Sequence, residues 1–357
     1  MEINKIIEQI NHLNIFHSDK YMHDFNFLSV ALKHLLPSLS LDDHLQIAKK
    51  CSYYQILSSH DENNYDLIKS IDKPHLDLSN KIIVTYHYSS YRLLNSLLIN
   101  WGIPFKIVTD NNYIKNQGEK TIQSYHKIAS NLQAKPHQFE ILNAEERTIL
   151  LKCKKAISDG YSLIFYADGN SGVGGMTKKN NMIKINFLEN EIYVRKGIAI
   201  LSSILKKPLT SILLSRDLTS NNVTFSIEDN IQYLNDRKNE KQLEETVRKI
   251  WRPLEKQVSN DPGQWEGWLY YYNFINFQNK VSKHIEPVKK SVFNCTDFGI
   301  GHIPKQNLFY LLDKKEFKFT LIDQETYKNL HNIIKTNKIP TDYPVYESMR
   351  KKGILTS

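Results

Sequence analysis

Apolar residues recur at three- and four-residue spacing through the first part of the chain, which predicts helices. The spacing is present in residues 5–16 and again in residues 25–36, and it is typical of helices that bury one face. Ser40 followed by Asp43 resembles a capping box, so a third helix is expected to begin there. Residues 1–78 are therefore predicted to form an N-terminal helical region.

From residue 81 onward, short β-branched apolar runs alternate with segments of helical spacing. The runs are apolar on both faces, as in strands that are buried on both sides. Strands that alternate with helices in this way predict an α/β fold with a mostly parallel central sheet flanked by helices. The expected strands are residues 81–87, 104–110, 161–169 and 208–217, and the stretch 141–160 is expected to be helical.

The pattern changes again near residue 278. Residues 280–290 indicate a basic, weakly structured connection, and residues 307–335 have the pattern of a hairpin followed by a helix. We therefore predict three parts, which are the N-terminal helical region (1–78), an α/β domain (79–277) and a small C-terminal α+β accessory domain (278–357).

Composition and charge narrow the class of protein. Of the 357 residues 41% are apolar, enough for a substantial core, and 47 Lys+Arg against 38 Asp+Glu give a net charge of +9. This charge favours acidic partners such as a membrane surface, nucleic acid or an acidic carrier protein, although a lysine-rich surface without a partner explains it equally well. No stretch approaches the roughly 18 apolar residues of a bilayer span, and no secretory signal is recognisable at the N-terminus.

The cysteines and histidines do not form a metal-binding or redox motif. Cys51, Cys153 and Cys295 match no zinc or C-x-x-C spacing and cannot all pair with one another. We therefore expect reduced thiols in a cytoplasmic protein, with peripheral contact at the inner membrane as a further expectation. No metal site is predicted. Nucleic-acid binding is not expected either, because no helix-turn-helix, zinc-finger or aromatic RNP pattern is present.

One histidine ends the first expected strand of the α/β domain. His87 lies just before a segment of helical spacing, and chemistry in parallel sheets gathers where strands end. A neutral imidazole there can take a proton from a hydroxyl or amine that attacks an acyl carbonyl. The plainer interpretation is a histidine that is hydrogen-bonded at the sheet edge, and position alone favours it.

Four segments, taken in order, resemble the glycerolipid and lipid A acyltransferase superfamily, which includes the lysophospholipid and late lipid A acyltransferases. They are TYHYSSYRLL around His87, FYADGNSG around Asp168, VRKGIAILSSILKKPL from Val194 and PGQWEGWLYYYNF from Pro262. The resemblance covers residues 79–277. It implies a glycerolipid-acyltransferase-like fold and a thioester-dependent acyltransferase in which His87 is the general base.

The sequence departs from the family pattern at the acid that should follow this histidine. The motif H-x-x-x-x-[DE] requires a carboxylate at position 92, where this chain has Arg92. A cation there would lower the pKa of His87 and oppose its protonation. Asp168, at the acidic position of the second motif, is the candidate replacement, although Asp-Gly-Asn is also a strong turn sequence. Glu140 and Asp110 are weaker candidates.

A glycine-rich loop follows Asp168. Its backbone N–H groups are expected to hold an oxyanion, and it lacks the lysine of a Walker loop and the spacing of a dinucleotide site. The expected substrate contacts in this loop are Gly169, Asn170, Ser171 and Gly172. Arg195 and nearby lysines are expected to meet the phosphate of a pantetheine arm or a phospholipid, with a solvated cationic face as the plainer alternative.

Residues beside His87 are also expected to contact substrate. They are Ser90, Tyr91 and Arg92. A nucleophilic Ser89 or Ser90 is a weaker alternative, because the chain has no G-x-S-x-G elbow.

The expected function is direct acyl transfer to an amine or hydroxyl, with His87 and Asp168 as the catalytic pair. The donor would be acyl carrier protein or acyl-CoA, so the chain would use a phosphopantetheine thioester and hold no tightly bound cofactor. No N-terminal membrane anchor is recognisable, so a small-molecule or carrier-bound acceptor is expected rather than a lipid deep in the bilayer. The rival hypothesis is a non-catalytic module that binds a carrier protein or an anionic lipid.

Overall fold

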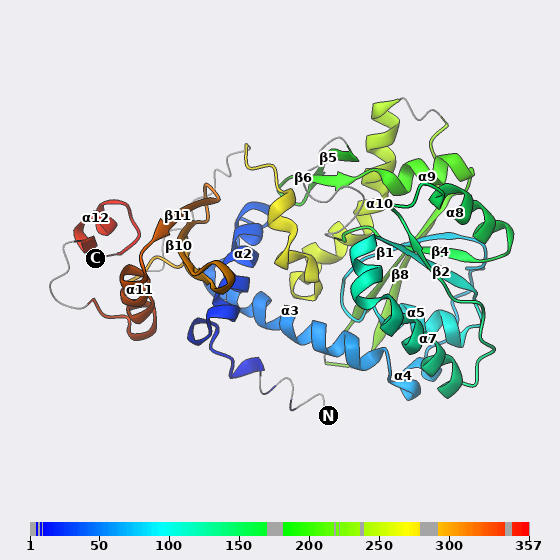
Figure 1. The fold of residues 1–357 in the computed structure, drawn as a ribbon, viewed down its shortest axis with the longest axis horizontal. Helices are drawn as coiled ribbons and strands as arrows, with labels where there is room; N and C mark the ends of the chain where they lie inside the picture. Colours follow the sequence, from blue (N-terminus) through cyan, green and yellow to red (C-terminus); the bar gives the residue numbers. More distant parts are fainter. Residues whose placement is uncertain are drawn as a thin grey trace. The chain divides into compact units, whose positions relative to one another are not determined.

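The structure is a computed structural model that describes residues 5, 8, 10–169, 181–217, 219–220, 222–235, 239–278, 292–339 and 345–356 (Figure 1). The chain divides into two compact units. The α/β unit comprises Cys51–Asn186 and Ile192–Gly267, and the terminal unit comprises Met1–Lys50, Phe187–Glu191 and Trp268–Ser357. Both ends of the chain therefore belong to one unit, which differs from the predicted division at residues 78 and 277.

A six-stranded, mostly parallel sheet forms the centre of the α/β unit, in the order β3-β2-β4-β1-β7-β8. All pairs are parallel except β7 with β8, which is antiparallel. This confirms the predicted α/β class with helices around a mostly parallel sheet. The strands are β1 (Ile82–Thr85), β2 (Phe105–Thr109), β3 (Ile141–Asn143), β4 (Ser162–Tyr166), β7 (Leu209–Arg216) and β8 (Val223–Ile231).

Helices flank this sheet (Figure 1), and one of them is buried almost all round. Leu93, Leu94, Leu97 and Leu98 of α5 pack with Ile83 of β1 in one core cluster, and each fully buried leucine contributes roughly 1.5–3 kcal/mol. The helices in or entering this unit are α3 (Leu41–Asp61), α4 (Tyr65–Ser70), α5 (Leu93–Asn100), α6 (Asn111–Tyr113), the π-helix η2 (Ile114–Gly118), α7 (Glu119–Asn131), α8 (Ile149–Ser158), α9 (Gly197–Leu205), α10 (Glu240–Asn260), η4 (Pro262–Gln264) and η5 (Glu266–Leu269).

One expected helix is partly a strand. The stretch 141–160 was predicted to be helical throughout, but Ile141–Asn143 forms β3 and only Ile149–Ser158 is helical. The strand forms because Ile141 pairs with Ile107 of β2, which lies far away in the sequence. Three residues are too few for a periodic pattern, so tertiary pairing decides the structure here. A further two-stranded sheet contains β5 (Met182–Phe187) and β6 (Asn190–Arg195).

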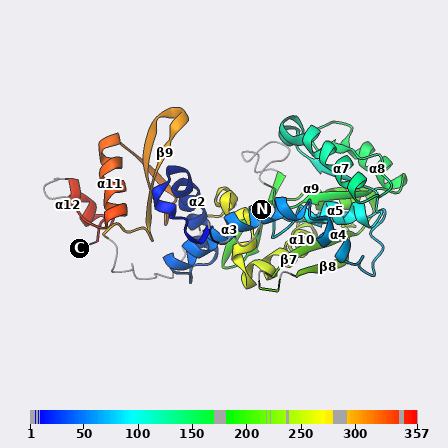
Figure 2. The same cartoon turned by 90° about the horizontal axis from the view of Figure 1, so that it is seen from below.

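The terminal unit contains a three-stranded antiparallel sheet in the order β11-β10-β9. Helix α2 packs on β9 (Figure 2), where Asn26 donates its side-chain N–H to the Ile300 carbonyl at 2.7 Å. This contact joins the N-terminal and C-terminal segments into one unit. Its elements are η1 (Ile15–His17), α2 (Asp19–Leu35), η6 (Tyr271–Phe274), β9 (Phe298–Ile303), η7 (Pro304–Gln306), β10 (Leu308–Asp313), β11 (Lys318–Ile322), α11 (Gln324–Thr336) and α12 (Val345–Lys351), which include the predicted hairpin and helix.

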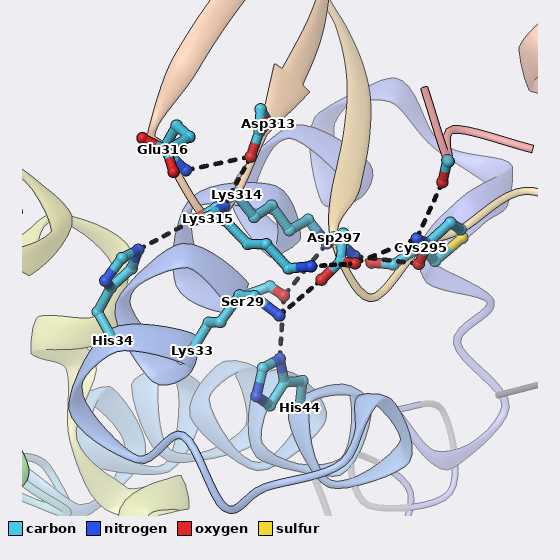
Figure 3. Close-up of polar contacts among 12 residues, drawn as sticks. Ser29, Lys33, His34, His44, Cys295, Asp297, Asp313, Lys314, Lys315 and Glu316 are labelled. Atoms are coloured by element: carbon cyan, nitrogen blue, oxygen red, sulfur yellow. Dashed lines mark hydrogen bonds and ion pairs between the residues drawn. The ribbon is translucent and has the colours of Figure 1, made fainter. Parts of the chain in front are cut away.

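A buried lysine of this unit makes polar contacts with residues of several segments (Figure 3). Lys314, which follows β10, donates its ammonium to the Cys295 carbonyl at 2.7 Å and to Ser29 Oγ at 3.2 Å. Ser29 Oγ is also 2.9 Å from Nδ1 of His44. Burial lowers the pKa of Lys314 to about 8, and burial together with the Lys314 charge lowers the pKa of His44 to about 3.

Across the described ranges, no helix has both the length and the apolar character required to cross a bilayer.

Candidate active site

The register of the parallel sheet brings two polar side chains together. Thr85 at the end of β1 pairs with Tyr166 at the end of β4, and the Ala167 amide continues the ladder to the Thr85 carbonyl at 2.9 Å. His87 and Asp168 each follow their strand by two residues. Because the carboxyl ends of parallel strands meet at one edge, both side chains lie at the same place.

His87 and Asp168 form a close hydrogen-bonded pair. Nδ1 of His87 lies 2.9 Å from Oδ1 of Asp168. The backbone N–H of His87 also donates to this carboxylate, at 3.1 Å to Oδ1 and 3.0 Å to Oδ2. Asp168 is fully buried, whereas the His87 side chain keeps 23% of its surface exposed. The buried carboxylate therefore holds both the main chain and the ring of the histidine.

The pKa of His87 lies above its ordinary value. Burial works against the protonated ring, but the Asp168 carboxylate, through its charge and its hydrogen bond, outweighs this effect. Arg92 lowers the pKa of His87, as expected for a nearby cation, but its effect is smaller. The net direction is therefore opposite to the one that Arg92 alone predicts.

Trp265 is a third member of the site, which the sequence analysis missed. Its indole Nε1 donates to Oδ2 of Asp168 at 2.8 Å, and the ring is fully buried. Its segment pairs with the loop that carries the histidine, because the Ser89 amide donates to the Gln264 carbonyl at 2.7 Å and the Glu266 amide to the His87 carbonyl at 2.9 Å. The only sequence signal for this role was the PGQW segment of the family resemblance.

His87 opens onto a cavity of about 790 Å³. Tyr91 and Tyr166 lie against its ring, with centroids 4.8 and 4.9 Å away. Tyr166 Oη accepts a hydrogen bond from Asn95 at 3.3 Å. Among the predicted substrate contacts, Tyr91, Arg92, Gly169 and Arg195 line this cavity.

The cavity wall has an apolar part and a charged part. The apolar side chains come mainly from β2, α8, β4 and α9, and they include Ile107, Ile149, Leu150, Cys153, Phe165, Ile200 and Leu201. The charged side chains of the described wall, apart from His87, are the cations Arg92, Lys120, Arg195 and Lys196 and the acids Glu62 and Asp110. Cations thus outnumber acids, which suits a substrate that is partly apolar and carries a negative group.

Ser90 does not line the cavity, which corrects its predicted role. It is fully buried and donates to Oδ2 of Asp61 at 2.6 Å, and the same oxygen lies 3.4 Å from Nε of Arg216. Ser89 is also buried and has a left-handed backbone with φ of +57°. Neither serine is therefore placed as a nucleophile in the cavity.

The predicted oxyanion loop is described only at its first residue. The Gly169 amide donates to the Tyr166 carbonyl at 3.3 Å, so it is not directed at a substrate. Asn170, Ser171 and Gly172 lie outside the described residues.

The two weaker candidates for the acid that pairs with His87, Glu140 and Asp110, have other partners. Glu140 is 2.7 Å from Nζ of Lys106, and Asp110 lines the cavity but caps α6 through the Asn112 and Tyr113 amides.

Within the described ranges, no three His, Cys, Asp or Glu side chains are grouped to hold a metal ion. Cys153 lines the cavity, but burial raises the pKa of its thiol to about 11, which disfavours the reactive thiolate.

A scan against protein-family models finds no match for this chain, and a search of the curated proteins finds no relative.

Proposed function

We propose that the chain is an acyltransferase, similar to the glycerolipid and lipid A acyltransferases, which moves an acyl group from a thioester to a hydroxyl or amine. The observation that carries the proposal is the contact of 2.9 Å between His87 and buried Asp168, at the wall of a cavity of about 790 Å³. Such a pair can accept and return a proton. The cavity has the size of a small-molecule site.

In this mechanism, Nε2 of His87 takes the proton from the acceptor as the acceptor oxygen or nitrogen attacks the thioester carbonyl. A C–O or C–N bond forms to give a tetrahedral intermediate. The C–S bond then breaks, and the imidazolium returns the proton to the leaving thiolate. Asp168 stabilises the imidazolium through Nδ1–H, as the aspartate does in a Ser-His-Asp site.

The two parts of the cavity wall correspond to the two parts of an acyl thioester. The apolar side chains of α8 and α9, such as Ile149, Ile200 and Leu201, suit the acyl chain. Arg92 and Arg195 suit the phosphate of a pantetheine arm, which both coenzyme A and carrier protein possess. The arm is a substrate in this proposal and not a resident cofactor.

The rival hypothesis of a non-catalytic binding module rested on the loss of the acid at position 92. Asp168 provides a carboxylate at His87 from another strand, which supports the enzyme over the binding module.

The experiment measures thiol release from acyl-CoA and from acyl carrier protein, with hydroxyl and amine acceptors added separately. All three cysteines of the chain are buried, so a thiol reagent gives a low background. His87→Ala should lower turnover about 10²–10⁴-fold. The matched control is His75→Ala, because His75 is exposed and does not line the cavity. Equal turnover by His87→Ala, or no acyl transfer by the wild type, would reject the proposal.

A further inference from the structure

Exposed apolar side chains occur on the helices that line the cavity. In the described part of the α/β unit, five large hydrophobic residues are exposed, and four of them are on the helices next to the cavity. We call these four the apolar rim, and they are Tyr113, Ile122, Leu150 and Leu151. Tyr113 and Leu150 line the cavity, and the other two directly follow a lining residue. The fifth, Ile56 of α3, is not part of the wall.

The leucines of the rim are not needed to pack their own helix. The buried face of α8 consists of Cys153, Ala156 and Ile157. Leu150 and Leu151 in the first turn remain 42% and 70% exposed. Full burial of a leucine side chain would contribute roughly 1.5–3 kcal/mol to the free energy of unfolding, and an exposed leucine lacks this contribution. Two adjacent exposed leucines, one of which lines the cavity, therefore indicate a surface that becomes buried against a binding partner.

The two segments that carry the apolar rim have a net positive charge. Residues 111–131 and 145–159, which carry it, contain seven lysines and arginines against four acids, a net charge of +3. Both segments lie along one margin of the unit, away from β7 and β8 (Figure 2). Segments that combine exposed apolar side chains with a net positive charge are typical of proteins that bind the interface of an anionic bilayer.

We infer that the apolar rim docks this protein on an anionic lipid surface, and that a lipid chain passes between the bilayer and the cavity alongside Leu150. Leu150 supports this route because it both lines the cavity and is exposed at the outer surface. Protruding aliphatic side chains suit a lipid phase, which deforms around them, better than the surface of an acidic protein. That the lipid takes part in acyl transfer rests on the proposed function, whereas docking does not.

The first experiment measures binding of the full chain to sedimenting vesicles of phosphatidylcholine with phosphatidylglycerol. The variants are Leu151→Ser and Leu150→Ser, and the matched control is Ile56→Ser, whose side chain is 41% exposed. We expect each rim variant to bind about tenfold more weakly and the control to bind as the wild type does. Circular dichroism and thermal unfolding verify that each variant folds.

Three results would overturn the inference. They are unchanged vesicle binding in the double variant Leu150→Ser/Leu151→Ser, an equal loss in Ile56→Ser, and loss of binding to acyl carrier protein by the rim variants without loss of vesicle binding. The last result would show that the rim binds a protein partner instead.

A second measurement separates failure of docking from failure of the proposed function. His87→Ala should bind vesicles like the wild type, because His87 is not part of the rim. Leu151→Ser should retain turnover of a short, water-soluble thioester and acceptor but lose turnover with a vesicle-borne acceptor. Equal turnover of both acceptors by Leu151→Ser would overturn the role of the rim in lipid delivery and leave acyl transfer standing. Rim-dependent vesicle binding without any turnover would support docking and reject the enzyme.

Discussion

Trp265 donates its indole N–H to Oδ2 of Asp168 at 2.8 Å, from a position 97 residues further along the chain. The other oxygen of the same carboxylate contacts the ring of His87 at 2.9 Å. The indole therefore fixes the orientation in which the carboxylate meets the imidazole. This relationship makes the site dependent on a segment that lies outside the parallel sheet.

Replacing Asp168 with asparagine should lower the pKa of His87. The carboxylate is the group that raises this pKa against the effect of burial, and asparagine removes its charge at nearly constant shape. NMR titration of the His87 ring measures the shift directly. The pH at which turnover reaches half its maximum should move in the same direction, and the maximum itself should fall. An unchanged His87 pKa in Asp168→Asn would contradict the assigned pairing.

The His87–Asp168 pair should also make stability depend on pH. Because the folded-state pKa of His87 lies above the ordinary value of 6.5, its contribution is fully present below about pH 6.5 and is lost as pH rises through the folded-state pKa. Urea unfolding of the wild type and His87→Gln across this range measures the difference. The stability gap between the two proteins should narrow as pH rises, and a gap that widens would refute this linkage.

Gly267→Ala should disturb the site from outside the cavity. A Cβ at position 267 would lie 2.2 Å from Cε2 of Trp265, so either the indole or the backbone must shift. We expect a loss of about 1–3 kcal/mol in the free energy of unfolding and a change in tryptophan fluorescence. Gly118→Ala is the control, since its Cβ would meet Ile114 only at an ordinary contact of 3.5 Å. Equal effects of the two variants would argue against a specific role for Gly267.

Because Lys314 is buried, the free energy of unfolding of the terminal unit should rise with pH in the alkaline range. Its folded-state pKa is about 8, against an ordinary value of 10.5. Between these values, the unfolded chain binds a proton that the folded chain does not, so the free energy of unfolding rises with pH. The rise should amount to about 3 kcal/mol. Lys314→Met should lose this slope in urea unfolding, although it also loses two hydrogen bonds. A slope that persists in the variant would assign it to other groups.

The sequence was sufficient for four of the five parallel strands, with β3 as the exception, and for the pairing of His87 with Asp168. Both side chains follow apolar runs that are buried in β1 and β4, and parallel pairing necessarily places the ends of such strands together. The family resemblance indicates the same histidine, and because position 92 is Arg92, Asp168 is the expected acidic partner. Local pattern and topology agree at this point of the fold.

Contacts between distant segments were not predictable in the same way. The Trp265 bond to Asp168 depends on how the segment after α10 returns to the sheet, and no periodic pattern encodes that path. The left-handed turn at Ser89 sends Ser90 to Asp61 rather than to the cavity. The packing of α2 on β9 joins residues 274 positions apart, through Asn26 and Ile300, so the division of the chain into units could not follow sequence order.

The Asp168 carboxylate accepts a hydrogen bond from the peptide N–H of His87 and also contacts the imidazole of the same residue. The carboxylate that contacts His87 therefore comes from the loop after β4, while position 92 is occupied by Arg92. Under the proposed function, an acid at position 92 is therefore not required to orient the imidazole, and Arg92 faces the cavity instead. A sequence pattern that requires an acid five residues after the histidine would not describe a His–Asp pair whose carboxylate comes from another strand.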